Sequence, residues 1–141
     1  MLKPTLAGLA LLGLAGHAAA ADNPLSAELW KTRPLVVLAE RADDPLLAEV
    51  RTALQQPANR EAFVEREMVL YTVIGDQGRR NDQPLSAAAT RGLLDALEAG
   101  DERPQLVLVG KDGGKKIQRS EGADLPAIFA TIDRMPMRRV D

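Results

Sequence analysis

Residues 106–116, LVLVGKDGGKK, combine an apolar run with glycines and lysines, which are residue types that can bind phosphate. A phosphate-binding loop of the Walker type needs a glycine, four intervening residues and then Gly-Lys followed by Ser or Thr, because backbone N–H groups surround the phosphates and the hydroxyl holds the metal. Here the glycines are too closely spaced, and Lys115 is followed by Lys116, which has no hydroxyl. No helix pattern follows, so no helix N-terminus is directed at an anion. The pattern therefore does not predict a phosphate site.

The sequence also lacks the side chains on which many enzyme sites depend. It contains no cysteine and a single histidine, His17. The absence of cysteine excludes a thiolate nucleophile and a disulfide. His17 lies in a segment that we expect to be removed, which excludes an imidazole base, a serine hydrolase triad and the usual zinc or copper ligand sets in the mature chain. We therefore expect no catalytic residues, no metal site and no cofactor.

Residues 1–21 predict a signal peptide. Lys3 supplies the positive charge, residues 6–14 form an apolar run too short to span a bilayer, and residues 18–20 are small enough for a cleavage site. Cleavage is predicted after Ala20 or Ala21. Residues 22–141 are then expected to form one domain, periplasmic in a Gram-negative bacterium or else secreted, with no membrane span.

The charge of this mature chain argues against nucleic acid as a partner. Loss of Lys3 from 18 basic and 20 acidic side chains leaves a net charge of −3. Phosphate backbones require clustered, uncompensated cations, and four aromatic residues are too few to form a base-stacking surface.

Hydrophobic periodicity predicts the order β-α-β-α-β-β-α. Continuous apolar runs typical of buried strands occupy 33–40, 67–74 and 104–110, and 115–120 has the single apolar residue expected of an edge strand. Asp112-Gly113 predicts a tight hairpin between the last two strands. The polar segment 75–84 predicts an exposed loop. Helices are predicted over 42–56, 86–97 and 124–135, and residues 59–66 are expected to form a further turn or two.

Three blocks of the sequence resemble one family. WKTRPLVVLAERADDPLL (30–47), LVLVGKDGGKK (106–116) and IDRMPMRR (132–139) are similar to domain of unknown function 4174, a peroxiredoxin-like family of exported bacterial proteins and some vertebrate extracellular matrix proteins. The resemblance implies a thioredoxin-like three-layer α/β/α sandwich. Its mixed sheet would have four strands in the order 4-3-1-2, with strand 3 antiparallel to the others.

The resemblance also implies where a reactive centre would lie. Thioredoxins and peroxiredoxins place their reactive cysteine at the start of the first crossover helix, where this chain reads Arg41-Ala42-Asp43-Asp44. Without a thiol, disulfide exchange and peroxide reduction by that chemistry are excluded. Pro104 takes the place of the cis-proline that borders the active site in thioredoxins, and a cis Arg103–Pro104 bond is implied.

Charged side chains in three loops are the main candidates for a ligand site. Loops at the carboxyl ends of parallel strands share one end of an α/β sheet, and an antiparallel third strand begins there too. A functional interpretation makes this rim an anion site, since guanidinium groups match carboxylates and phosphates. The alternatives are solvated loop charges and, for the adjacent aspartates, a helix cap. The candidate residues are Arg41, Asp43, Asp44, Arg79, Arg80 and Arg103.

The C-terminal MPMRR segment is a candidate protein interface. Methionine and arginine are enriched at adaptable interfaces, which points to Met135, Met137, Arg138 and Arg139. In the alternative, the methionines fold back onto the sheet. The lone tryptophan, Trp30, is expected to close one end of the core rather than to form a binding face.

Two functions remain open from the sequence. The preferred hypothesis is a non-catalytic thioredoxin-like module that binds or scaffolds a partner protein in the cell envelope. The alternative is a cysteine-independent binder or enzyme for a small anionic ligand, which would use the Arg/Asp rim.

Overall fold

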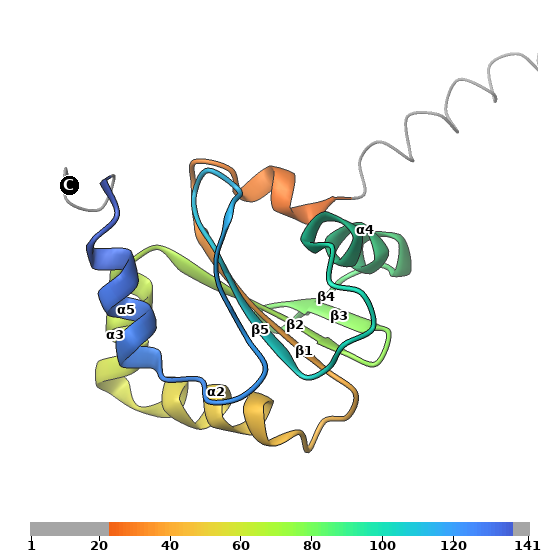
Figure 1. The fold of residues 1–141 in the computed structure, drawn as a ribbon, viewed down its shortest axis with the longest axis horizontal. Coiled ribbons are helices and arrows are strands. Elements are labelled where there is room, and N and C mark those ends of the chain that lie inside the picture. Colours follow the sequence, from red (N-terminus) through yellow and green to blue (C-terminus); the bar gives the residue numbers. More distant parts are fainter. Residues whose placement is uncertain (1–22, 137–141) are drawn as a thin grey trace, which may run out of the picture.

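A computed structural model describes residues 23–136, and the predicted signal peptide lies outside these residues. The described chain begins with a short 3-10 helix and continues with six strands and four α-helices (Figure 1). In chain order, these elements are η2 (Pro24–Glu28), β1 (Arg33–Ala39), α2 (Pro45–Gln55), α3 (Pro57–Glu65), β2 (Met68–Ile74), β3 (Gln77–Arg80), β4 (Gln83–Pro84), α4 (Ala87–Leu97), β5 (Gln105–Val109), β6 (Lys115–Arg119) and α5 (Leu125–Asp133).

The elements form one mixed sheet with the strand order β4-β3-β2-β1-β5-β6. β1 pairs with β2 in parallel, whereas β5 runs antiparallel to both β1 and β6. The four strands expected from the sequence therefore have the predicted order and directions. The predicted number of strands was wrong, because the sheet has six strands and not four.

The two additional strands lie in the segment 75–84, which was predicted to be an exposed loop. Two-residue connections join the strands, since Ile74 pairs with Gln77 and Arg80 pairs with Gln83. Gly75 and Asn81 have φ values of 62° and 53°, as such tight connections require. Because its residues are polar, the segment was predicted to be a loop, although it forms two hairpins at the edge of the sheet.

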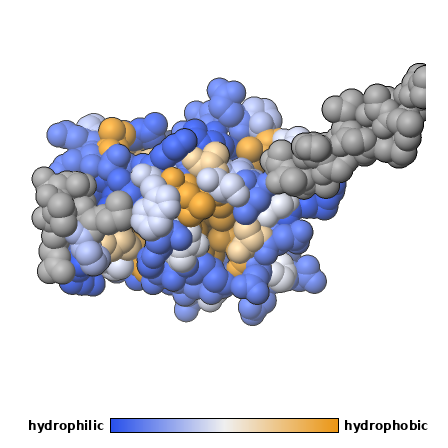
Figure 2. Space-filling view, turned by 90° about the horizontal axis from the view of Figure 1, so that it is seen from above, coloured by the Kyte–Doolittle hydropathy of each residue, from blue (hydrophilic) through white to orange (hydrophobic). Residues whose placement is uncertain are grey.

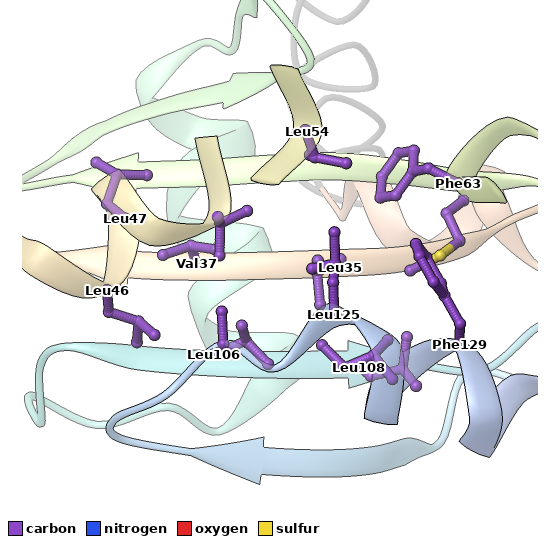
Figure 3. Close-up of a cluster of buried hydrophobic side chains, with 14 of the residues drawn as sticks. Leu35, Val37, Leu46, Leu47, Leu54, Phe63, Leu106, Leu108, Leu125 and Phe129 are labelled. Carbon is purple, nitrogen blue, oxygen red and sulfur yellow. The ribbon is translucent and has the colours of Figure 1, made fainter. Parts of the chain in front are cut away.

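Helices cover both faces of the sheet (Figure 1). On one face, α2, α3 and α5 pack against alternate residues of β1 and β5, and these side chains form the larger hydrophobic cluster (Figure 3). On the other face, α4 and η2 cover the intervening residues of β1 and β5 together with β2. The three-layer α/β/α arrangement follows because both faces of the central strands are apolar.

Side-chain caps define where three of the helices begin. Asp44, Ser86 and Asp124 each accept a hydrogen bond from a backbone N–H in the first turn of α2, α4 and α5. Sequence patterns predicted the caps of α2 and α5, leaving Asp43 or Asp44 open for α2. No helix within residues 23–136 has the length and apolar character needed to cross a membrane.

Candidate functional site

The loop after β1 contains three of the predicted rim residues. Arg41 and Asp43 form an ion pair of 3.2 Å with each other, and both side chains are more than three-quarters exposed, at 78% and 77%. Asp44 accepts hydrogen bonds of 2.8 and 3.2 Å from the backbone N–H groups of Leu46 and Leu47. The Asp44 carboxylate is thus a helix cap, which is the structural alternative that the sequence left open.

Arg103 uses its guanidinium to join the ends of the two parallel strands. Its Nη1 donates hydrogen bonds of 3.0 Å to the Ala39 carbonyl and 2.7 Å to the Gly75 carbonyl. The Arg103–Pro104 peptide bond that follows is cis, as the resemblance implied. This guanidinium therefore contributes to the structure by satisfying carbonyls where β1 and β2 end.

We expect Arg103→Ala to lower the free energy of unfolding by about 1.5–3 kcal/mol, because two partly buried carbonyls lose a charged donor. Arg41→Ala is the matched control. Its ion pair with Asp43 is largely exposed, so its loss is expected to change stability by less than about 0.5 kcal/mol. Urea unfolding of both variants measures the difference. Equal effects would contradict the structural role of Arg103.

The two hairpin arginines lie further along the sheet and have different partners. Arg79 Nη1 donates to the Asp82 carbonyl at 3.4 Å within the hairpin. Arg80 lies opposite Tyr71 in the middle of β2 and forms an ion pair of 2.7 Å with Glu28. Each predicted rim arginine therefore has a separate partner, and the structure does not bring the six candidates together as one anion site.

Two clefts remain at this end of the sheet. One, of about 710 Å³, is lined by the Asp101–Gln105 segment and by residues 118–120 at the end of β6. The other, of about 300 Å³, lies between the β2–β3 connection and α4. Within residues 23–136, no group of three or more carboxylates or histidines is arranged to hold a metal ion. The first cleft is lined mainly by polar and charged side chains, whereas the lining of the second also includes Leu85, Ala87 and Leu94.

A buried polar cluster, which sequence reasoning missed, joins η2 to the sheet. The Glu28 carboxylate accepts hydrogen bonds from Tyr71 Oη at 2.5 Å, Arg80 Nε at 2.7 Å and Thr32 Oγ1 at 2.7 Å. Glu28 and Tyr71 are buried, and Arg80 covers them from the β3 side. No local signal identifies this cluster, because Glu28, Tyr71 and Arg80 come from three elements, η2, β2 and β3, that only the fold brings together.

Burial and hydrogen bonding act in opposite directions on Glu28. Burial raises the pKa of its carboxyl, but the donors Arg80, Tyr71 and Thr32 outweigh this effect and hold the pKa below the usual 4.5. Burial, followed by the adjacent carboxylate, raises the pKa of Tyr71. The hydrogen bond with Glu28 raises the pKa of Arg80. The cluster therefore holds an ion pair and a neutral phenol, an arrangement suited to anchoring η2.

The turn after η2 exposes the lone tryptophan, contrary to the sequence prediction. Trp30 is 62% exposed and Leu29 is 40% exposed. The Lys31 N–H donates to the Glu28 carbonyl, and the φ values of Leu29 and Trp30 are −55° and 63°, as in a type II turn. That geometry normally selects glycine at the position of Trp30. The aromatic ring is thus held outside the core by a backbone conformation that is unfavourable for it.

A small pocket lies beside this exposed aromatic side chain. The Trp30 N–H donates to the Lys111 carbonyl at 2.8 Å, which joins the turn to the β5–β6 connection at the upper end of the sheet in Figure 1. Figure 2 faces this end and shows hydrophobic surface near its centre. The pocket measures about 200 Å³. Its lining residues are Trp30, Arg33, Gly110, Lys111, Asp112, Lys116, Met135 and Pro136.

Of the predicted C-terminal interface, Met135 is the residue that the structure describes. It is partly buried against the larger hydrophobic cluster and also lines the pocket. Met137, Arg138 and Arg139 lie outside the described residues. The predicted interface therefore stays a prediction, with one of its residues placed beside Trp30.

A family model for a domain of unknown function, DUF4174, matches residues 24–141. The chain belongs to the DUF4174 family. A thioredoxin-fold protein from Helicobacter pylori is similar in structure, with 14% sequence identity, a TM-score of 0.46 and coverage of 73% of this chain and 68% of that one. Comparison with curated proteins gives no match.

The three blocks that carry the DUF4174 resemblance meet at the Trp30 pocket. Block 30–47 supplies Trp30 and Arg33, block 106–116 supplies the β5–β6 connection, and block 132–139 supplies Met135 and Pro136. The lining of this pocket comes entirely from these blocks. The three blocks therefore come together at the Trp30 end of the sheet, and block 30–47 also extends to Arg41, Asp43 and Asp44 at the charged rim.

Proposed function

We propose that this DUF4174 chain is an exported, non-catalytic thioredoxin-like domain that binds a protein partner in the cell envelope through its Trp30 end. Export rests on residues 1–21, whose charge, apolar run and small residues predict a signal peptide. The binding role rests mainly on the exposure of Trp30 in a turn position that disfavours it. An unfavourable backbone conformation that is retained at a surface supports a functional role for the side chain it presents.

The chemistry of the fold supports binding over catalysis. The chain has no cysteine, and the segment where this fold carries its reactive thiol is occupied by an exposed ion pair and the cap of α2. Tryptophan, in contrast, is among the residues most enriched at the energetic centres of protein interfaces. The anion-site alternative has less support, because Arg41, Arg80 and Arg103 each have a separate partner within the domain.

Photo-crosslinking in the native host tests this proposal. A benzophenone amino acid replaces Leu29 at the Trp30 end or, as the control, the exposed Gln77 at the opposite end of the sheet. We expect the Leu29 probe to give a light-dependent, saturable adduct with one envelope protein and the Gln77 probe to give none. Adducts from Gln77 alone, or from neither position, would count against the Trp30 end as an interface.

A further inference from the structure

The pocket beside Trp30 has the size of a single side chain. Small-molecule sites generally enclose about 300–1,000 Å³, whereas this pocket measures about 200 Å³. Its walls come from the η2–β1 turn, the β5–β6 connection and the segment after α5, which the Trp30–Lys111 backbone hydrogen bond helps to hold together. One apolar side chain from another protein is the occupant that fits this volume.

The charge around the pocket is opposite to the charge of the whole chain. Arg33, Lys111 and Lys116 contribute to the lining and outnumber its acidic member, Asp112, although the complete sequence has a net charge of −2. Lys111 forms an ion pair of 2.7 Å with Glu67, and Lys116 forms one of 3.0 Å with Asp112. Lys31, next to Trp30, is exposed and makes no ion pair within residues 23–136. A basic pocket rim on an acidic domain favours a partner surface of negative charge.

We propose that the pocket receives one aliphatic or aromatic side chain from an acidic segment of the partner protein, with carboxylates beside that residue facing Lys31. This inference rests on the proposed function, since it specifies the partner of the same surface. The apolar side chain packs on the Trp30 ring and Met135. The carboxylates supply orientation and raise the rate of encounter.

Two peptide libraries test this chemistry on residues 22–141. Both contain nine-residue peptides with one central apolar position, flanked by Asp and Glu in the first library and by Lys and Arg in the second. Trp30 is the only tryptophan in the sequence, so its fluorescence reports directly on the pocket. We expect saturable changes with the acidic library at concentrations at least about tenfold lower than with the basic library, and weaker binding at high salt.

Charge reversal locates the interaction. Lys31→Glu is expected to weaken binding of the acidic library about tenfold. Arg91→Glu, which makes the same change in net charge on the exposed surface of α4, is expected to leave it unchanged. Equal responses to the two libraries, no response to either, or equal effects of the two variants would overturn the inference.

The crosslinking experiment separates this inference from the proposed function. If the Leu29 probe captures a partner whose crosslinked segment is neutral or basic, the acidic-segment inference fails and the binding function stands. If the Leu29 probe captures no partner, the proposed function itself fails.

Discussion

Replacing Glu28 with alanine is expected to lower the free energy of unfolding by about 2–4 kcal/mol. The change leaves the buried Tyr71 hydroxyl without its acceptor and removes the counter-charge of Arg80. The hydroxyl contributes most of this effect, because the Arg80 side chain is 43% exposed and water can solvate it. Thermal and urea unfolding of the purified domain measure the loss.

Alanine variants of Arg80 and its neighbour Arg79 test the same cluster, with Arg79→Ala as the control. Arg80→Ala leaves the buried Glu28 carboxylate without its ion-pair partner and is expected to be clearly destabilising. Arg79→Ala removes a long hydrogen bond of 3.4 Å within the exposed hairpin and is expected to change stability by less than about 0.5 kcal/mol. Equal stabilities of the two variants would show that the cluster does not anchor η2.

The shifted pKa values of Glu28 and Tyr71 should make the stability of the domain depend on pH. Because the folded-state pKa of Glu28 is lowered, its contribution is complete above the unfolded value of 4.5 and is lost as the pH falls through the folded value. Tyr71 acts in the opposite direction, since its raised pKa makes stability fall as the pH rises above the unfolded value of 10.0. Glu28→Gln removes the acid-side contribution. Its stability is therefore expected to depend less on pH below 4.5 than that of the wild type.

Trp30→Asn is expected to weaken partner binding at least about 30-fold, equivalent to about 2 kcal/mol, while the domain stays folded. Asparagine adopts the left-handed conformation more readily than tryptophan, so the substitution relieves about 1 kcal/mol of backbone strain. Removal of the buried part of the tryptophan ring lowers stability. The two effects are similar in size, and we expect stability within about 1 kcal/mol of the wild type.

Val64→Asn is the control for this prediction. Val64 is 64% exposed on α3, similar to Trp30, but does not line the pocket. Partner capture from the envelope and the affinity for the acidic peptide library are measured for both variants alongside the melting temperature. A loss of binding that accompanies unfolding of Trp30→Asn, or an equal loss in both variants, would contradict a specific interface at Trp30.

Local patterns in the sequence determined much of the scaffold. Apolar runs located β1, β2 and β5, because strands buried on both faces need continuous hydrophobic residues. Asp112-Gly113 located the β5–β6 turn, and Gly113 has the positive φ that this turn requires. The absence of cysteine excluded thiol chemistry without any structure. The strands and the turn depend on residues close together in the chain, and the absence of cysteine is a matter of composition, which is why sequence reasoning reached them.

Only the tertiary structure decided which polar and aromatic side chains meet. Glu28 lies 43 residues from Tyr71 and 52 residues from Arg80, and their contact depends on β3 pairing with β2, in a segment whose polarity predicted a loop. The same strand pairing places Arg80 beside Tyr71 and Glu28 and not at the predicted rim. As the lone tryptophan, Trp30 was expected to close one end of the core, but it lies in a type II turn and is 62% exposed. Periodicity identifies the elements, whereas strand pairing and backbone conformation determine where a particular side chain points.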